Sequence, residues 1–369
     1  MKVLFITREG YELAGARVRC HNFARELNSA GIEAGVFSFA EQLGAKCGEK
    51  EFEMSLWWKL WLNIRAFKVL MKEGPDTVFF LQRVNYHILA PLFVVLLKKN
   101  RFIFDCDDWN MRENPVYHFG FYPSSKMEYL TGRVARKAAA CIAASNFLYE
   151  YLCPFNRNTH RLVTGVDAAL FMSRPRPDDG RVTFSWTGTA YHPEMGDNLK
   201  FILECFTAVA DKQASVFLSL AGEGKYFEEI RNTARQHKHG SRILIHTWIP
   251  ADNMPEYLSG IDVGLLPLIQ ATKFNLGKSP TKLFEYMSMG KPVVASSTGE
   301  ARHIVRHGQT GFLAEDKERF IEGMCVLAED VHRRRCMGLE ARKDVEAKYA
   351  LKVLGRQLVG IIEGITGKT

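Results

Sequence analysis

The feature of this sequence that most constrains its fold is an alternation of short apolar runs with helical segments, which occurs twice. The first series has strand-like runs at 2–7 and 33–39, separated by a glycine-bearing loop and a helix that ends at Gly31. The second series has its first strand-like runs at 182–187, 215–221 and 243–248. Strands alternating with helices predict parallel sheets covered by helices on both faces. We therefore predict an α/β protein with two doubly wound, Rossmann-like domains facing across a cleft.

A stretch rich in proline, aspartate and glycine, 175–180, separates the two series and is typical of a linker. A chain of 369 residues is long enough for two domains of ordinary size. We place the first domain at 1–172 and the second at 173–349.

Composition limits the kinds of partner and the compartment. The net charge of +8 and the pI near 9.0 suit an acidic ligand, a membrane surface or nucleic acid, although no signature of a nucleic-acid module is present. The cysteines are scattered without a CxxC pair, which argues against zinc and favours reduced thiols. The first apolar run is too short for a signal peptide, and the run 88–97 is half a membrane span interrupted by Pro91. We expect a cytoplasmic protein.

The stretch 278–296 has the pattern of a short helix followed by a buried strand. Ser279 suits the N-cap, Pro280 the first helical position, and Gly290 a left-handed helix end. A helix N-terminus attracts anions, above all phosphate, and Lys278 and Lys282 add positive charge there.

Glu285 shares a helix face with Thr281, one turn beyond this predicted phosphate pocket. A carboxylate at that position is well placed to accept hydrogen bonds from two neighbouring hydroxyls, such as those of a ribose. The alternative is an ordinary capped helix with an exposed Glu–Lys pair.

Two other groups of charged residues follow strands of the first series. Arg17 and Arg19 come after the glycine-bearing loop and either face an anion or lie in solvent on a helix. Asp105, Asp107 and Asp108 end a strand, where acidic residues bind a metal, orient an acceptor hydroxyl or cap a loop. We favour the acceptor or structural roles, because no partner ligands recur elsewhere.

The segment 56–72 predicts an amphipathic helix with tryptophans at 57, 58 and 61 and lysines at 59, 68 and 72. We place Asn63 with the lysines on the polar side. Such a helix fits a membrane surface, and it fits equally a helix packed on the sheet with its lysines in water. Both interpretations stay open here.

Taken in order, the motifs resemble those of a retaining glycosyltransferase of the family-4 type on the GT-B scaffold, in a bacterial-type subgroup. The matching elements cover nearly the whole chain: the loop with Gly15, the junction 164–171, Gly188, the triplet 222–224, Pro267, the stretch 280–295 and the late turn 308–313.

The resemblance implies a nucleotide-diphosphate sugar on the second domain and a sugar or lipid-linked acceptor on the first, without a cofactor or metal. Glu285 would bind the ribose, and the N–H groups from Thr281 to Leu283 the diphosphate. The base would lie beside Trp248 and Ile249. The other donor-binding residues implied are Gly15, Arg17, Arg19, Gly188, Thr189, Glu223 and Lys278. Asp107, Asp108 and Lys282 are the predicted catalytic residues.

The same resemblance implies that a last helix within 350–369 crosses back to the first domain. Its apolar residues have helical spacing: Leu354, Leu358, Ile361 and Ile362. Front-face attack would retain the anomeric configuration, with the leaving phosphate helping to deprotonate the acceptor.

Two departures from the family pattern qualify the prediction. Gly277 stands where the family usually has a second glutamate, and Thr189 and Met195 stand where it often has an arginine and a lysine. Either the charges have moved to Lys278, Lys282 and the two arginines, or activity is reduced. The alternative functions are a nucleotide-sugar epimerase and a non-catalytic nucleotide-sugar-binding module.

Overall fold

The structure is a computed structural model that describes residues 1–109, 117–118, 122–123, 125–172 and 179–367. The chain forms two compact units. The first unit holds Met1–Gly165, Leu276–Ser279 and Leu351–Thr369, and the second holds Val166–Asn275 and Pro280–Ala350. Most of the linker predicted at 175–180 lies outside the described residues.

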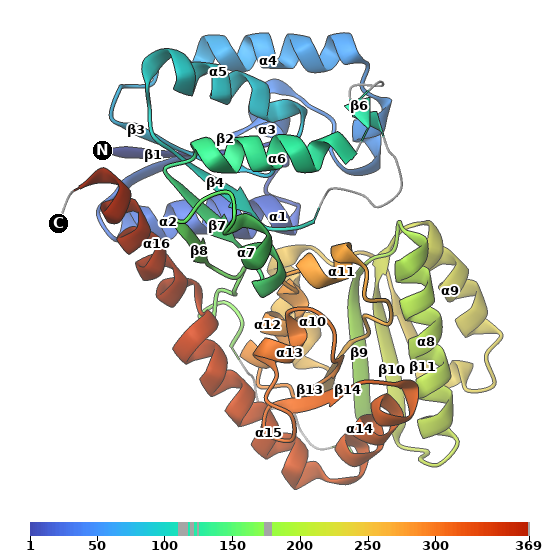
Figure 1. Ribbon diagram of the computed structural model, residues 1–369. Coiled ribbons are helices and arrows are strands. Elements are labelled where there is room, and N and C mark those ends of the chain that lie inside the picture. Colours follow the sequence, from blue (N-terminus) through green and yellow to red (C-terminus); the bar gives the residue numbers. More distant parts are fainter. Residues whose placement is uncertain (110–116, 119–121, 124, 173–178, 368–369) are drawn as a thin grey trace. The chain divides into compact units, whose positions relative to one another are not determined.

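The first unit is built on a six-stranded sheet in the order β2-β1-β3-β4-β7-β8 with every pairing parallel (Figure 1). Its strands are β1 Lys2–Thr7, β2 Glu33–Ser38, β3 Thr77–Gln82, β4 Phe102–Cys106, β7 Ala140–Ala143 and β8 Thr159–Arg161. Its longer helical segments are η1 Arg17–Asn22, α2 Phe23–Ser29, α4 Leu56–Leu70, α5 Leu89–Lys98, α6 Ser125–Lys137, α7 Asn146–Leu152 and α16 Leu351–Thr366. The short elements are α1 Ala14–Ala16, α3 Phe39–Leu43, η2 Gly48–Glu53, η3 Tyr86–Ile88 and the pair β5 Tyr117–His118 and β6 Tyr122–Pro123. The central strand β3 is buried along its whole length, as a parallel sheet covered on both faces requires.

The second unit repeats this architecture with the strand order β11-β10-β9-β12-β13-β14, again entirely parallel. Its strands are β9 Val182–Thr189, β10 Val216–Glu223, β11 Ile243–His246, β12 Val263–Leu266, β13 Val293–Ser296 and β14 Gly311–Ala314. Its longer helices are α8 Pro193–Ala210, α9 Lys225–Arg235, α12 Thr281–Ser288, α14 Lys317–Glu329 and α15 Val331–Asp344. The short elements are η4 Gly240–Arg242, η5 Ala251–Asn253, α10 Met254–Ser259, α13 Ala301–Ile304 and η6 Val345–Tyr349, and α11 Lys273–Gly277 runs from this unit into the first.

Each unit has its own hydrophobic core beneath its helices. The two predicted α/β series are therefore two separate doubly wound sheets, which confirms the fold class.

The boundaries of the two units differ from the predicted ones by short segments of the chain. The N-terminal segment of the first unit ends at Gly165 rather than at 172, because Val166 already bridges to Ala350 in the second unit. The C-terminal helix α16 belongs to the first unit, where it packs on α2 (Figure 1). Leu354, Leu358 and Ile362 are among its buried residues.

The region around α12 corrects one local prediction. Ser279 does not cap the helix: its hydroxyl accepts a hydrogen bond from the Thr164 N–H, at 2.9 Å, within the first unit. Pro280 occupies the N-cap position instead. The other end is as predicted, because Gly290 is left-handed with a φ of 66° and the strand β13 follows it.

Among the described residues, no helix combines the length and the apolar character needed to cross a bilayer.

Candidate functional site

The second unit offers a binding position where its strand order reverses. The chain builds β9, β10 and β11 outward in one direction and then returns to place β12 on the other side of β9. In open α/β sheets, ligands bind beyond the carboxyl ends of the strands at such a reversal. Gly188 and Thr189 are the last residues of β9, so these two predicted donor-binding residues lie at the strand reversal.

Lys282 reaches this same position from α12. Its ammonium lies 4.3 Å from the centre of the Trp186 ring and 2.8 Å from the point where a Cβ on Gly188 would stand. Gly188 also has a φ of 145°, which disfavours any other residue. A side chain at 188 would displace the ammonium, so the glycine keeps a cation beside exposed backbone at the strand end. That combination suits a phosphate.

A buried tyrosine holds α12 in place on the sheet. The Tyr286 hydroxyl accepts a hydrogen bond from the Thr187 N–H of β9 at 3.0 Å and lies 3.2 Å from the Thr187 hydroxyl. Tyr286 is fully buried, and burial raises the pKa of its hydroxyl well above the ordinary value. The neighbouring Glu285 and the preceding Lys282 are thereby fixed relative to the end of β9.

The helix offers fewer backbone donors than predicted. The Leu283 N–H already donates to the Pro280 carbonyl at 3.0 Å, and the Leu283 side chain is fully buried. Leu283 is therefore wrongly placed among the diphosphate ligands. Thr281 and Lys282, the first two helical residues, keep N–H groups that the helix itself cannot satisfy.

Four predicted donor residues lie at or shortly after the ends of strands in the second unit. Thr189 is exposed at the end of β9, and Glu223 at the end of β10 accepts a hydrogen bond from the Tyr191 hydroxyl at 2.9 Å. Trp248, which is 37% exposed, and Ile249 follow the edge strand β11. Met195 is buried near the start of α8, so no lysine is available at the position where the resemblance places one.

In the first unit, the corresponding edge carries a network of buried charges. Arg83 pairs with Asp107 through Nε to Oδ1 at 2.5 Å and through a terminal nitrogen to Oδ2 at 2.8 Å. Gln82 donates to the same Oδ2 at 2.8 Å and to the Gly15 carbonyl at 3.1 Å. Burial pushes the pKa of Asp107 upward, but the adjacent Arg83 guanidinium brings it below the ordinary value.

This network corrects the catalytic prediction for Asp107. Both carboxylate oxygens are engaged and the side chain is almost fully buried, so Asp107 positions Arg83 and the Gly15 loop. Arg83 itself has a φ of 58°, a strained conformation for a residue other than glycine that often marks a functional site.

Arg19 is also corrected, because it neither contacts an open anion site nor lies in solvent. It is fully buried, with Nε 3.1 Å from an Asp105 oxygen and a terminal nitrogen donating to the carbonyls of Leu162 and Val163 at 2.7 and 3.0 Å. Arg17 differs, since it is half-buried and donates to the Glu12 carbonyl of its own loop at 3.0 Å.

Asp108, the third acidic residue of this edge, differs from Asp105 and Asp107 in its contacts. Its Oδ1 is buried and accepts no hydrogen bond from the described residues. Burial raises the pKa of Asp108 above the ordinary value, and the charges of Arg83 and Lys278 oppose that rise. Lys278 thus acts on Asp108 within the first unit, and it precedes α12 rather than lying on its first turn.

The structure gives a physical reason for Gly277, where the family pattern has glutamate. A Cβ at this position would stand 2.9 Å from the Trp109 Cβ and 3.3 Å from the Trp109 backbone nitrogen. The close contact with Trp109, next to Asp108, excludes a side chain at 277 without a local rearrangement.

The network of buried charges continues from Arg83 to Arg8, Glu9 and Glu51, and the sequence analysis did not identify these three residues. Arg8 pairs with Glu51 and, at 3.0 Å, with Glu9, and Glu9 lies 3.4 Å from Arg83. Glu9 directly follows a predicted strand, so its place at the edge was predictable. Glu51 comes from η2, and local pattern gives no signal for that contact.

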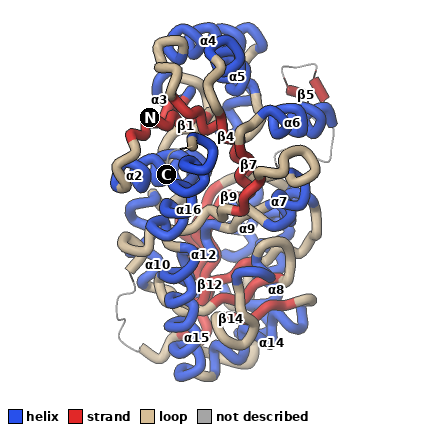
Figure 2. The backbone as a smooth tube through the Cα atoms, turned by 60° about the vertical axis from the view of Figure 1, so that its left-hand side comes forward, coloured by secondary structure: helices blue, strands red, loops and turns tan. Residues whose placement is uncertain are grey.

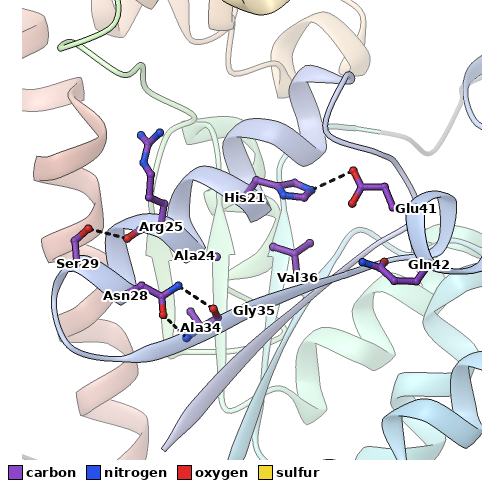
Figure 3. A pocket seen from close by; sticks show the side chains of 10 residues that line it. All are labelled: His21, Ala24, Arg25, Asn28, Ser29, Ala34, Gly35, Val36, Glu41 and Gln42. Atoms are coloured by element: carbon purple, nitrogen blue, oxygen red, sulfur yellow. Dashed lines mark hydrogen bonds and ion pairs between the residues drawn. The ribbon is translucent and has the colours of Figure 1, made fainter.

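A surface groove elsewhere in the first unit does not include a predicted site residue. It lies between η1, α2 and the edge strand β2, as Figure 3 shows. Asn28 pairs its amide with both backbone groups of Ala34, at 2.8 and 2.9 Å, and His21 approaches Glu41 at 3.7 Å. The groove thus borders the edge strand β2, where the Asn28 side chain forms hydrogen bonds with the backbone groups of Ala34.

Comparisons with known proteins agree with this arrangement. Residues 181–330 match the family of glycosyl transferases group 1. A GDP-mannose-dependent monoacylated alpha-(1-6)-phosphatidylinositol monomannoside mannosyltransferase of Corynebacterium glutamicum is 23% identical over 214 residues, which is 55% of each chain. The alignments with curated relatives span only 28% to 55% of the relatives' own length.

Solved structures share the fold over the whole chain. HepE of Anabaena, crystallised with UDP and glucose, has a TM-score of 0.71 at 15% identity and covers 99% of this chain and 100% of its own. Sucrose-phosphate synthase of Thermosynechococcus elongatus has a TM-score of 0.74 at 14% identity, with 100% of both chains covered.

Two doubly wound units with a candidate phosphate position at the strand reversal define the class of GT-B proteins. Within that class, the resemblance to the glycosyltransferases is confirmed, and residues 181–330 are the portion that matches the group 1 glycosyl transferases.

Proposed function

We propose that this protein transfers a sugar from a nucleotide-diphosphate donor to a hydroxyl acceptor, with retention of the anomeric configuration. The observation that carries the proposal is the Lys282 ammonium held beside Gly188 at the strand reversal of the second unit. Nucleotide sugars present two adjacent phosphates, and a cation beside the N-terminus of a helix is the chemistry that binds them.

The remaining donor contacts follow from the same end of the sheet. The Glu285 carboxylate would accept from the ribose hydroxyls, because it lies one turn after the first residues of α12. Trp248 and Ile249 would border the base, and Thr189 and Glu223 the phosphates and sugar. HepE was crystallised with UDP and the related mannosyltransferase depends on GDP-mannose, so both nucleotides are candidate donors.

In the reaction, the bond between the anomeric carbon and the donor phosphate breaks as the acceptor oxygen attacks from the same face. The acceptor hydroxyl loses its proton to the leaving phosphate oxygen, and Lys282 balances the charge that develops there. Asp108 would orient the acceptor hydroxyl in the first unit, since its Oδ1 is buried without a described partner. The acceptor is a glycan, a lipid-linked sugar or a small molecule.

The test incubates the protein with a panel of UDP- and GDP-sugars and measures nucleotide release with and without candidate acceptors. Release that rises with an acceptor supports transfer, and NMR of the product gives the anomeric configuration. A new nucleotide sugar without release would instead support an epimerase. Binding with neither outcome would support a non-catalytic binding module.

We further propose that the reaction needs no metal and takes place in the cytoplasm. Activity that survives EDTA supports the first statement, and activity that requires an added divalent cation contradicts it. All eight cysteines are free thiols, which is consistent with the reducing compartment of the second statement.

A further inference from the structure

The first unit exposes an apolar face that the transfer reaction does not use. On α4, Trp57, Trp61 and Ile64 recur at helical spacing and are 79%, 43% and 57% exposed. On α5, Phe93, Leu96 and Leu97 lie on one side of the helix and are 59%, 57% and 64% exposed. We call these six residues the α4–α5 face. Figures 1 and 2 both show α4 and α5 side by side at one end of the unit.

The two helices pack against each other, and hydrogen bonds join them. The buried Asn63 of α4 donates to the Tyr86 carbonyl at 3.0 Å and accepts from the Ala90 N–H at 3.0 Å. At the other end, the Lys98 ammonium donates to the Met71 carbonyl at 3.0 Å. The prediction that Asn63 belongs to a solvated polar side is therefore wrong, and it is the tryptophans that point outward.

The two helices that carry this face contain basic residues and no acidic ones. The sequence has no aspartate or glutamate from 54 to 72 or from 84 to 101. Lys68, Lys72 and Lys99 are exposed on the same two helices or directly after them. The Arg65 guanidinium lies 4.6 Å from the centre of the Trp61 ring, which places a further cation beside the tryptophans.

From these observations we infer that the α4–α5 face docks on an anionic lipid bilayer. Tryptophan is the residue that best occupies the boundary between headgroups and acyl chains, and lysines around an apolar surface attract anionic headgroups. An exposed apolar surface on helices whose charged residues are all basic fits a uniformly negative membrane better than a protein of mixed charge. The inference goes beyond the transfer reaction and is tested without donor or acceptor.

The experiment measures flotation of the full chain with vesicles of phosphatidylcholine alone and of phosphatidylcholine with phosphatidylglycerol, at low and high salt. We expect binding to the anionic vesicles about tenfold stronger than to the neutral ones, with most of that preference lost at high salt. The double variants Trp57→Ser/Phe93→Ser and Lys68→Glu/Lys72→Glu should each weaken binding about tenfold or more.

Matched controls lie on the second unit. Leu339→Ser removes an apolar side chain that is 62% exposed, and Lys200→Glu reverses an exposed lysine, and neither should change vesicle binding. Thermal unfolding checks that every variant is folded. The inference is overturned if the wild type does not bind anionic vesicles, or if the control substitutions weaken vesicle binding as much as the substitutions in the α4–α5 face do. It is also overturned if light scattering shows that the face variants change only self-association or the capture of a protein partner.

Discussion

At the residue scale, the packing around Gly277 explains why the second glutamate of the family pattern is missing. The position lacks a carboxylate because Trp109 occupies the space that a Cβ would need. The sequence alone shows a missing glutamate and suggests reduced activity. The structure instead shows a packing constraint next to Asp108 that accounts for a glycine at this position.

We predict that Gly277→Ala lowers the free energy of unfolding by about 1–3 kcal/mol, because the added Cβ meets the rigid Trp109 backbone and Cβ. Gly277→Glu should lose at least as much and should not gain activity. Gly364→Ala is the control, since nothing lies within 4 Å of a Cβ there. Urea unfolding measures the stability of each variant, and a transfer assay measures its activity. A Gly277→Glu protein that is as stable as the wild type and has a higher transfer rate would contradict the prediction.

His87 provides a second prediction at this scale. It is buried, its Nε2 lies 2.9 Å from the Gln82 carbonyl, and burial together with the Arg8 charge lowers its pKa to about 3. The unfolded chain keeps the ordinary value of 6.5 and therefore binds the proton more readily at acid pH. Stability is complete above the unfolded pKa and falls as the pH drops below it.

Between pH 7 and pH 5, His87 should account for a loss of about 2 kcal/mol in the free energy of unfolding. In His87→Gln, whose amide can still donate to the Gln82 carbonyl, the stability curve should be flatter by about that amount. Chemical denaturation at several pH values measures both curves. Parallel curves for the two proteins would show that His87 is not held neutral.

Several residue roles could not be read from the sequence. Arg19 and Arg17 look alike in the loop, but Arg19 is buried by Asp105 and by carbonyls more than a hundred positions away in the chain. The same holds for Asp107, which Arg83 and Gln82 engage. Such partners depend on which strands become neighbours, and local sequence carries no information about that.

At the scale of elements, most predictions from local pattern hold. The strand and helix alternation and the left-handed Gly290 follow from apolar runs and turn residues, which act locally. Ser279 fails as a cap because a distant backbone N–H, that of Thr164, takes its hydroxyl. The outward side of α4 was also ambiguous, since the burial of Asn63 depends on its hydrogen bonds to Tyr86 and to Ala90 of α5.

The hydrogen bond between Tyr286 and Thr187 of β9 allows a test of how α12 is held on the sheet. Tyr286→Phe should lower the free energy of unfolding by about 1–3 kcal/mol, because the buried Thr187 N–H loses its acceptor. Tyr129→Phe, at a position 62% exposed, should have almost no effect. Thermal and urea unfolding compare the two variants. A Tyr286→Phe protein as stable as the wild type would mean that the hydroxyl does not hold the helix.

At the scale of the whole molecule, the first unit is assembled from three separate stretches of the chain. Its last stretch is α16, whose buried apolar residues pack on α2. Helical spacing predicted the apolar side of α16, whereas its attachment to the first unit followed only from the resemblance.

Leu358→Ala should therefore destabilise the first unit by about 2–5 kcal/mol, because Leu358 is fully buried. Glu363→Ala, on the exposed side of the same helix, should be nearly neutral. Removal of 351–369 should expose the apolar surface of α2 and promote aggregation. Calorimetric unfolding and light scattering are the measurements, and a stable, monomeric truncated chain would contradict the packing.

The donor site of the second unit is the central claim, and calorimetry of nucleotide binding tests it most directly. UDP and GDP are compared with uridine and guanosine for the wild type, Lys282→Ala, Glu285→Gln and the control Lys200→Ala. Lys282→Ala should weaken the diphosphate by about one to two powers of ten and leave the nucleoside unchanged, because its target is phosphate. Glu285→Gln should weaken both, because both carry the ribose. Wild-type-like diphosphate binding by Lys282→Ala would remove α12 from the donor site and contradict the account.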